Sequence, residues 1–73
     1  MNDIKPFCEL LRDAIKESKH SQTYIADTFG IPLRTLQDWV AGKRVPMQYV
    51  QISLLNDIGG LIYSEKYNDL FED

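Results

Sequence analysis

The chain has 73 residues, of which 44% are hydrophobic and 26% charged, and its formal net charge is −3. This length suffices for one small domain with a modest core but leaves no room for a deep catalytic cleft. No stretch approaches the roughly 20 apolar residues that a membrane-spanning helix needs. Composition therefore predicts one small soluble domain, and it argues against both an enzyme and a membrane protein.

The first predicted element is an amphipathic helix that ends at Lys19 and His20. Asp3 is placed to cap it, and Pro6 falls within its first turn, where a proline is tolerated. The residues of its inward face recur every three or four positions, which is the period of one helix face. They are Ile4, Phe7, Cys8, Leu11, Ala14, Ile15 and Ser18. We expect this helix to pack against the next two.

The following stretch is typical of two short helices joined by a tight turn. Ser21 is expected to cap the first helix, and Gly30 to provide the left-handed backbone that ends it. Pro32 suits the first turn of the second helix, residues 32–41, and Gly42 ends that helix. Helices of about two turns are too short to be stable alone. Two of them with glycine at the bend predict a helix-turn-helix, whose second helix enters the major groove of DNA.

The remainder of the chain is expected to hold one or two more helices. Pro46 is placed to start a fourth helix, and the pair Gly59-Gly60 to end it. One face of this helix is apolar: Met47, Val50, Leu54 and Ile58. Beyond it, Ser64 followed by apolar residues at helical spacing favours a short fifth helix, although residues 61–63 could also run extended.

We therefore predict an all-α fold, a compact bundle of four to five short helices that contains a helix-turn-helix. Residues 1–60 form the helix-turn-helix domain in this prediction, and residues 61–73 form an acidic, aromatic tail packed on that domain or at a dimer contact. The spacing of Trp39 from Leu36 favours packing of the indole over a role as a stacking platform. The predicted core consists of Ile15, Ile25, Ala26, Leu36, Trp39, Val40, Val50 and Leu54.

Over residues 7–58 the chain resembles the phage-repressor-like (Xre-type, lambda-repressor-like) helix-turn-helix family. More than seven residues match the family in order and without gaps: Gln22, Ile25-Ala26, Gly30-Ile31, Thr35-Leu36, Trp39 and Gly42-Lys43-Arg44-Val45-Pro46. Each residue is common by itself, but the ordered set is not expected by chance. The resemblance implies a sequence-specific DNA-binding protein and a repressor-like transcriptional regulator, and it leaves the target sequence open.

The outward side of helix 32–41 supplies the candidate base contacts, because its apolar residues turn inward. These candidates are Leu33, Arg34, Gln37 and Asp38. In the family, the positions that match Leu33, Arg34 and Asp38 commonly touch base edges. Arg34 can donate two hydrogen bonds to guanine, Gln37 can pair with adenine, and Leu33 can cover a thymine methyl group. Asp38 can accept a bond from cytosine, discriminate against wrong bases by repulsion, or pair with Arg34 one turn away.

Five further residues match places where the family contacts the DNA backbone. Gln22, with Ser21 and Thr23 beside it, resembles the family's phosphate-clamping position at the start of a helix. Simple helix capping is the other interpretation, and both can hold together. Lys43 and Arg44 follow the second helix, where the family meets the backbone again, and a solvated turn is the alternative there.

The chain departs from the family at one pair of positions. The family often carries arginine at the position of Ile15 and glutamate at that of Val40, and these form a partly buried ion pair. Both residues are aliphatic here. Replacement of a buried ion pair by apolar residues of similar volume is often neutral or stabilising, so the fold is expected to persist. A group that could orient phosphate-contacting side chains is lost.

The basic residues gather in the part of the chain that would contact DNA. Residues 14–56 hold five basic and three acidic residues, a net charge of +2, whereas residues 57–73 carry −4. Because five cations are few for tight binding, and because family members usually place two domains one DNA turn apart, we expect a homodimer on double-stranded DNA. The C-terminal segment would form the contact, with packing onto the fourth helix as the alternative. Its large apolar residues are Tyr63, Tyr67, Leu70 and Phe71.

No catalytic, metal or cofactor site is predicted. His20 is the single histidine and Cys8 the single cysteine, so no nucleophile is paired with a base and no metal ligands cluster. We expect a reduced core thiol at Cys8 and a solvated loop or cap residue at His20. The absence of an export signal after Met1 predicts a cytoplasmic protein. The main rival to DNA binding is a protein-interaction module or antitoxin-type adaptor on the same fold.

Overall fold

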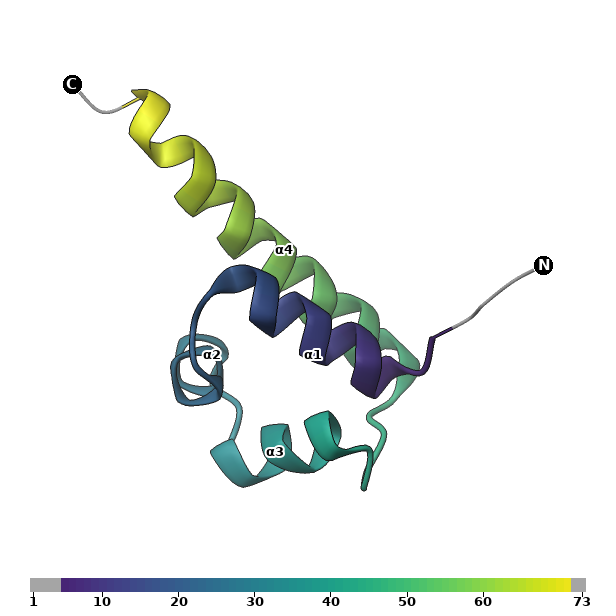
Figure 1. Cartoon of the computed structure of the whole chain (residues 1–73). Coiled ribbons are helices and arrows are strands. Elements are labelled where there is room, and N and C mark those ends of the chain that lie inside the picture. Colours follow the sequence, from purple (N-terminus) through teal and green to yellow (C-terminus); the bar gives the residue numbers. More distant parts are fainter. Residues whose placement is uncertain (1–4, 72–73) are drawn as a thin grey trace.

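The computed structural model describes residues 5–71, with side chains described as far as residue 66, and the regular structure within this range is helical (Figure 1). The elements are α1 (Phe7–Ser18), α2 (Gln22–Phe29), α3 (Leu33–Ala41) and α4 (Gln48–Phe71). α1 packs along α4 and against α3, and α2 packs against α3. The carboxyl end of α4 extends past α1 and away from the other helices (Figure 1). The predicted all-α bundle is confirmed, with three short helices and one long one.

α1 begins slightly later than predicted. Pro6 has extended backbone angles (φ −64°, ψ 156°) and precedes the helix instead of lying in its first turn. Its fixed φ allows this conformation, and its carbonyl accepts the first helical hydrogen bonds. Asp3 and Ile4 lie outside the described residues. At the other end, Lys19 adopts the left-handed conformation (φ 64°), and its N–H donates to the carbonyl of Lys16, which ends α1 as expected.

The boundaries of α2 and α3 follow the sequence closely. Ser21 caps α2 as predicted, because its Oγ accepts a hydrogen bond from the N–H of Tyr24 at 3.0 Å. Gly30 (φ 68°) and Gly42 (φ 78°) end the two helices in the left-handed conformation that glycine adopts without strain. Pro32 (φ −56°, ψ 133°) lies just before α3, not in its first turn. The connection between the helices is therefore the short segment 30–32.

The fourth helix is longer than predicted, which corrects the interpretation of Gly59-Gly60. α4 continues through both glycines, so no separate fifth helix exists within the described residues. Leu61 and Ile62 extend the apolar face that contains Ile58 and pack against the core. A glycine in a helix interior costs only about 1 kcal/mol relative to alanine, and this packing offsets the cost. None of the described helices, α4 included, combines the length and apolar composition needed to cross a membrane.

The core lies where α1, α2, α3 and the first half of α4 meet. Its buried apolar residues, within the described range, are Phe7, Leu11, Ile15, Ile25, Ala26, Leu36, Leu54 and Ile58. The prediction that three further residues belong to the buried core is wrong, because they are only half-buried: Trp39, Val40 and Val50. Leu36 is the one fully buried residue of α3, so Trp39 and Val40 pack at the margin of the core. Val50 and Trp39 line a groove that is open to solvent.

Two other apolar residues are more exposed than predicted. Met47 is 67% exposed, because α4 begins only at Gln48 and Met47 therefore does not belong to its apolar face. Pro46 likewise precedes the helix. Cys8 is half-buried and not fully within the core. It lies beside the end of α3, where a Cβ added to Gly42 would be 3.4 Å from the Cys8 Sγ.

Candidate nucleic-acid interface

The outward side of α3 carries the residues that the sequence proposes as base contacts. Leu33 is 37% exposed, and Arg34 and Gln37 are exposed as well. These exposed positions lie in the first half of α3, whereas Leu36 on the same helix is fully buried. They present one apolar, one cationic and one amide group to solvent. Asp38 differs from them, because its side chain is only 25% exposed.

Asp38 holds the turn that follows α3. Its Oδ2 lies 3.7 Å from the Nε of Arg44, and its backbone carbonyl accepts hydrogen bonds from the N–H groups of Lys43 (2.9 Å) and Arg44 (3.4 Å). The hypothesis that Asp38 pairs with Arg34 is therefore wrong. The left-handed Gly42 folds the chain back over the helix end, which brings Arg44 to the carboxylate. Among the described residues Arg34 forms no ion pair and is available to a ligand.

The amino end of α2 contains the other predicted contacts with the DNA backbone. Ser21 Oγ is occupied by the cap to Tyr24, while Gln22 is half-buried and Thr23 is exposed. The first N–H groups of a helix have no partner within it, and the helix dipole is positive at this end. This end of α2 can therefore accept an anionic group such as a phosphate.

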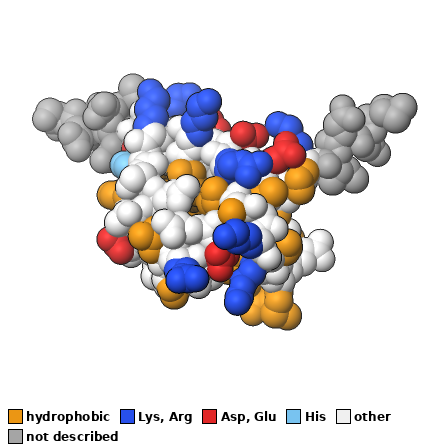
Figure 2. Space-filling model, turned by 60° about the horizontal axis from the view of Figure 1, so that its bottom comes forward, with side chains coloured by type: hydrophobic (Ala, Val, Ile, Leu, Met, Phe, Trp, Pro, Cys, Tyr) orange, Lys and Arg blue, Asp and Glu red, His pale blue; other side chains and the backbone are white. Residues whose placement is uncertain are grey.

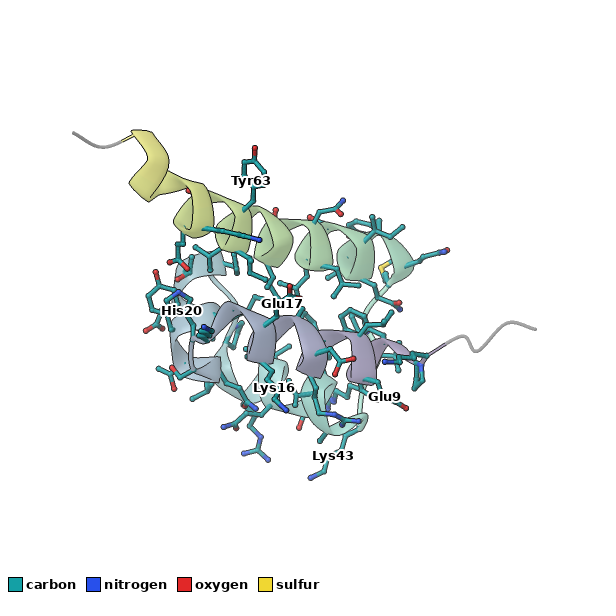
Figure 3. The ribbon with its side chains drawn as sticks, turned by 45° about the horizontal axis from the view of Figure 1, so that its top comes forward. Glu9, Lys16, Glu17, His20, Lys43 and Tyr63 are labelled. Carbon is teal, nitrogen blue, oxygen red and sulfur yellow. The ribbon has the colours of Figure 1, made fainter. Side chains whose placement is uncertain are left out.

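Basic side chains extend the candidate interface from α3 to α1. Lys43 and Arg44 are exposed after α3, and Arg12 and Lys16 are exposed on α1. Lys16 and Lys43 project toward the same side of the molecule, away from α4, while Tyr63 projects from the opposite side (Figure 3). Figure 2 shows this side with Lys and Arg side chains in two groups, each with acidic side chains among them, and with mostly uncharged surface between the groups. Sequence reasoning missed Arg12 and Lys16, although their spacing already places them together on the polar face of one helix.

Arg12 also joins α1 to the end of α3. Its Nη1 donates a hydrogen bond of 2.8 Å to the backbone carbonyl of Val40. The last carbonyls of a helix lack partners within it, and the helix dipole makes that end negative, so a guanidinium group stabilises it. The segments that contain Ile15 and Val40 are thus joined by a hydrogen bond from a side chain to the backbone.

His20 lies in the loop between α1 and α2, as expected, but its side chain is only 25% exposed because it is held by two other residues. Its Nε2 lies 2.9 Å and 2.8 Å from the two carboxylate oxygens of Glu65 on α4. Its ring stacks on Tyr24, with centroids 3.9 Å apart and an interplanar angle of 14°. No local pattern could indicate the contact with Glu65, because the partners are 45 residues apart in the sequence. The contact ties the amino end of α2 to the second half of α4.

The residues predicted for a dimer contact are described only in part. Tyr63 is 65% exposed and lies on the side of the molecule opposite Lys16 and Lys43 (Figure 3). The backbone of α4 continues to Phe71. The side chains of Tyr67, Leu70 and Phe71 lie outside the described residues.

Comparison with known proteins does not place the chain in a family. No protein-family model, curated protein or solved structure matches it. The resemblance to the phage-repressor-like family therefore rests on the ordered residues of segments 21–31 and 35–46.

Proposed function

We propose that the protein binds double-stranded DNA sequence-specifically and acts as a repressor-like transcriptional regulator, with α2 and α3 as its helix-turn-helix. The observation that carries this proposal is the joint exposure of Leu33, Arg34 and Gln37 on one side of α3. An apolar group, a guanidinium and an amide suit the major-groove edges of thymine, guanine and adenine. A regulator of the phage-repressor type acts in the cytoplasm.

The surroundings of α3 support contacts with the DNA backbone. Lys43 is exposed and has no ion-pair partner among the described residues, so its charge is available to a phosphate. Arg44 shares its charge with Asp38 at 3.7 Å and would contribute less. The amino end of α2, with Gln22 and Thr23, offers backbone donors. Phosphate contacts of these kinds position a recognition helix, while the contacts to base edges supply specificity.

We further propose that the functional form is a homodimer joined through the second half of α4. This part of the helix extends beyond the other helices, so it can reach a second copy without covering α3 (Figure 1). Replacement of Leu70 and Phe71 by glutamate in the full chain should make the protein monomeric at tens of micromolar. Sedimentation analysis checks this expectation, with Asp69→Asn as the control variant. A wild-type protein that is monomeric at this concentration would contradict the dimer.

The proposed DNA-binding activity is tested with genomic DNA. The full chain is incubated with random genomic fragments, and the bound fragments are sequenced. We expect enrichment of a short common sequence and a loss of affinity between about 50 and 200 mM salt, because counterions are released at phosphate contacts. Binding without any enriched sequence would indicate non-specific association and would contradict sequence-specific binding. Absence of binding at low salt would contradict the proposal.

A second candidate function is supported by a different surface. Four large apolar side chains near the start of α4 are more than half exposed: Val45, Met47, Tyr49 and Ile52. Exposed apolar residues that lie close together are common at protein-binding sites. This feature favours a protein-interaction module or antitoxin-type adaptor. Absence of DNA binding at any salt concentration, together with capture of one defined partner, would support this alternative over the first.

A further inference from the structure

A groove with a volume of about 200 Å³ opens between the end of α2, the inner side of α3 and the first half of α4. Three aromatic residues line it, one from each helix: Phe29, Trp39 and Tyr49. Ile31 and Leu54 form apolar parts of its wall, and Asp57 of α4 contributes the one charged side chain. None of the residues that line the groove is proposed to contact DNA. The groove is therefore separate from the candidate nucleic-acid interface.

The bottom of the groove is apolar, and its rim is polar. Leu54 is 4% exposed, and Phe29, Ile31 and Trp39 are half-buried. Tyr49, in contrast, is 68% exposed, and Asp57 is exposed. A ligand in the groove would therefore place an apolar surface against Leu54 and the aromatic rings, while a polar part could remain in solvent.

The charge of Asp57 has no counterpart nearby. Its carboxylate forms no ion pair and accepts no hydrogen bond from any described residue, and no Lys, Arg or His lines the groove. Aromatic faces attract cations through their quadrupole, and an adjacent carboxylate adds to the attraction. An anion such as a phosphate or carboxylate would be repelled by Asp57. A bare metal ion would make no use of the apolar wall.

We propose that this groove binds a small organic ammonium ion, with its alkylated nitrogen against the aromatic rings and its charge beside Asp57. The volume supports this class of ligand. An apolar cavity of about 150 Å³ accommodates benzene, whereas pockets for drug-sized molecules occupy about 300–1,000 Å³. A groove of about 200 Å³ therefore suits a single compact head group such as a trimethylammonium or short-chain amine.

Trp39 provides the measurement, because it is the single tryptophan of the chain and lines the groove. The full-length protein is titrated with choline, and in parallel with 3,3-dimethylbutan-1-ol, a neutral molecule of the same shape, at constant ionic strength. We expect a saturable change of Trp39 fluorescence with choline in the millimolar range. The neutral molecule should bind about five- to tenfold more weakly, which is the difference expected from a cation–π contact with an added carboxylate.

Variants test how much the charge of the groove contributes to binding, independently of its shape. Asp57→Asn keeps the size of the side chain and should remove most of the preference for choline over the neutral molecule. Asp27→Asn, an exposed position on α2 that does not line the groove, should leave that preference unchanged. Equal affinity of wild-type protein for the two molecules would overturn the proposal, as would a fluorescence change that does not saturate. The comparison of choline with the neutral molecule on wild-type protein tests the proposal even if Asp57→Asn fails to fold. This comparison does not depend on DNA binding.

Discussion

Arg34 and Lys43 are both exposed cations, but their surroundings differ. Arg34 projects from α3 between Leu33 and Gln37, whereas Lys43 lies in the turn after the helix. A guanidinium group in the major groove can donate two hydrogen bonds to guanine. An ammonium group at the border of the interface is placed only for phosphate. If the protein binds DNA as proposed, the two residues should contribute to different properties of binding.

The Arg34→Ala variant should lose about 1–3 kcal/mol of binding free energy on the preferred DNA sequence and relax the preference at one base pair. Lys43→Ala should weaken binding to all sequences alike and reduce the slope of log affinity against log salt by about one. Anisotropy titrations on the preferred duplex and a scrambled duplex, each at several salt concentrations, measure both effects. An equal loss on both duplexes for Arg34→Ala would exclude it from base contacts.

The Asp38→Asn variant should increase affinity for non-specific DNA. The substitution removes a negative charge beside the proposed recognition surface and frees Arg44, whose Nε lies 3.7 Å from the carboxylate. Loss of this pair adds one available cation, so the salt slope on a scrambled duplex should rise by about one. Asp13→Asn on α1 makes the same charge change next to Lys5 and serves as the control. An identical effect of the two variants would show that only net charge matters.

At the scale of a helix, the continuity of α4 through its two glycines has a measurable consequence. Gly59 and Gly60 have open space around the position of a Cβ, so alanine meets no obstacle there. Gly59→Ala and Gly60→Ala should each raise the free energy of unfolding by about 1 kcal/mol, because alanine favours the helix. Urea denaturation measures this change.

Gly30→Ala is the matched control for these substitutions. Its Cβ would also meet nothing within 4 Å, but its φ is 68°, which strains any residue with a Cβ. The control should therefore lower the free energy of unfolding by about 1 kcal/mol or more. If Gly59→Ala were destabilising like Gly30→Ala, α4 would end at the glycines after all.

A charged hydrogen bond from Arg12 supplements the core packing between α1 and α3. Arg12→Ala removes the bond to the Val40 carbonyl, and we expect a loss of about 0.5–1 kcal/mol in the free energy of unfolding, since the contact is exposed to solvent. Arg12→Lys should restore part of the loss, because lysine can still donate one bond. Lys16→Ala removes the same charge one turn later and should have little effect. Equal destabilisation by Arg12→Ala and Lys16→Ala would argue against the anchor.

Across the whole molecule, the contact between His20 and Glu65 links elements that are distant in the sequence. Glu65→Gln keeps the size of the side chain and removes its charge, and it should speed amide hydrogen exchange in residues 61–66. The imidazole and carboxylate are 25% and 44% exposed, so solvent screening limits the loss in stability to at most about 1 kcal/mol. Glu17→Gln on α1 is the control. Unchanged exchange in Glu65→Gln would show that the contact with His20 does not hold this part of α4 in place.

Much of the fold follows from local chemistry. The helices and most of their ends could be predicted because apolar spacing, the Ser21 cap and the left-handed Gly30 and Gly42 act within a few residues. The outward position of Leu33, Arg34 and Gln37 follows from the same periodicity. Burial was less predictable. The helical period shows which face turns inward but not how far each neighbouring helix covers it, so the half-burial of Trp39 could not be derived.

The sequence by itself determined four helical segments, the short turn between two of them and the polar groups that one helix presents to solvent. These properties depend on neighbours in the chain. Only the tertiary structure decided that α4 continues past Gly59-Gly60, because packing of Leu61 and Ile62 on the core outweighs the weak helix propensity of glycine. It also decided that Arg12 binds the end of α3, 28 residues away, and that His20 meets Glu65, 45 residues away. Such pairs form when whole helices pack, and no pattern within a few residues of the chain specifies them.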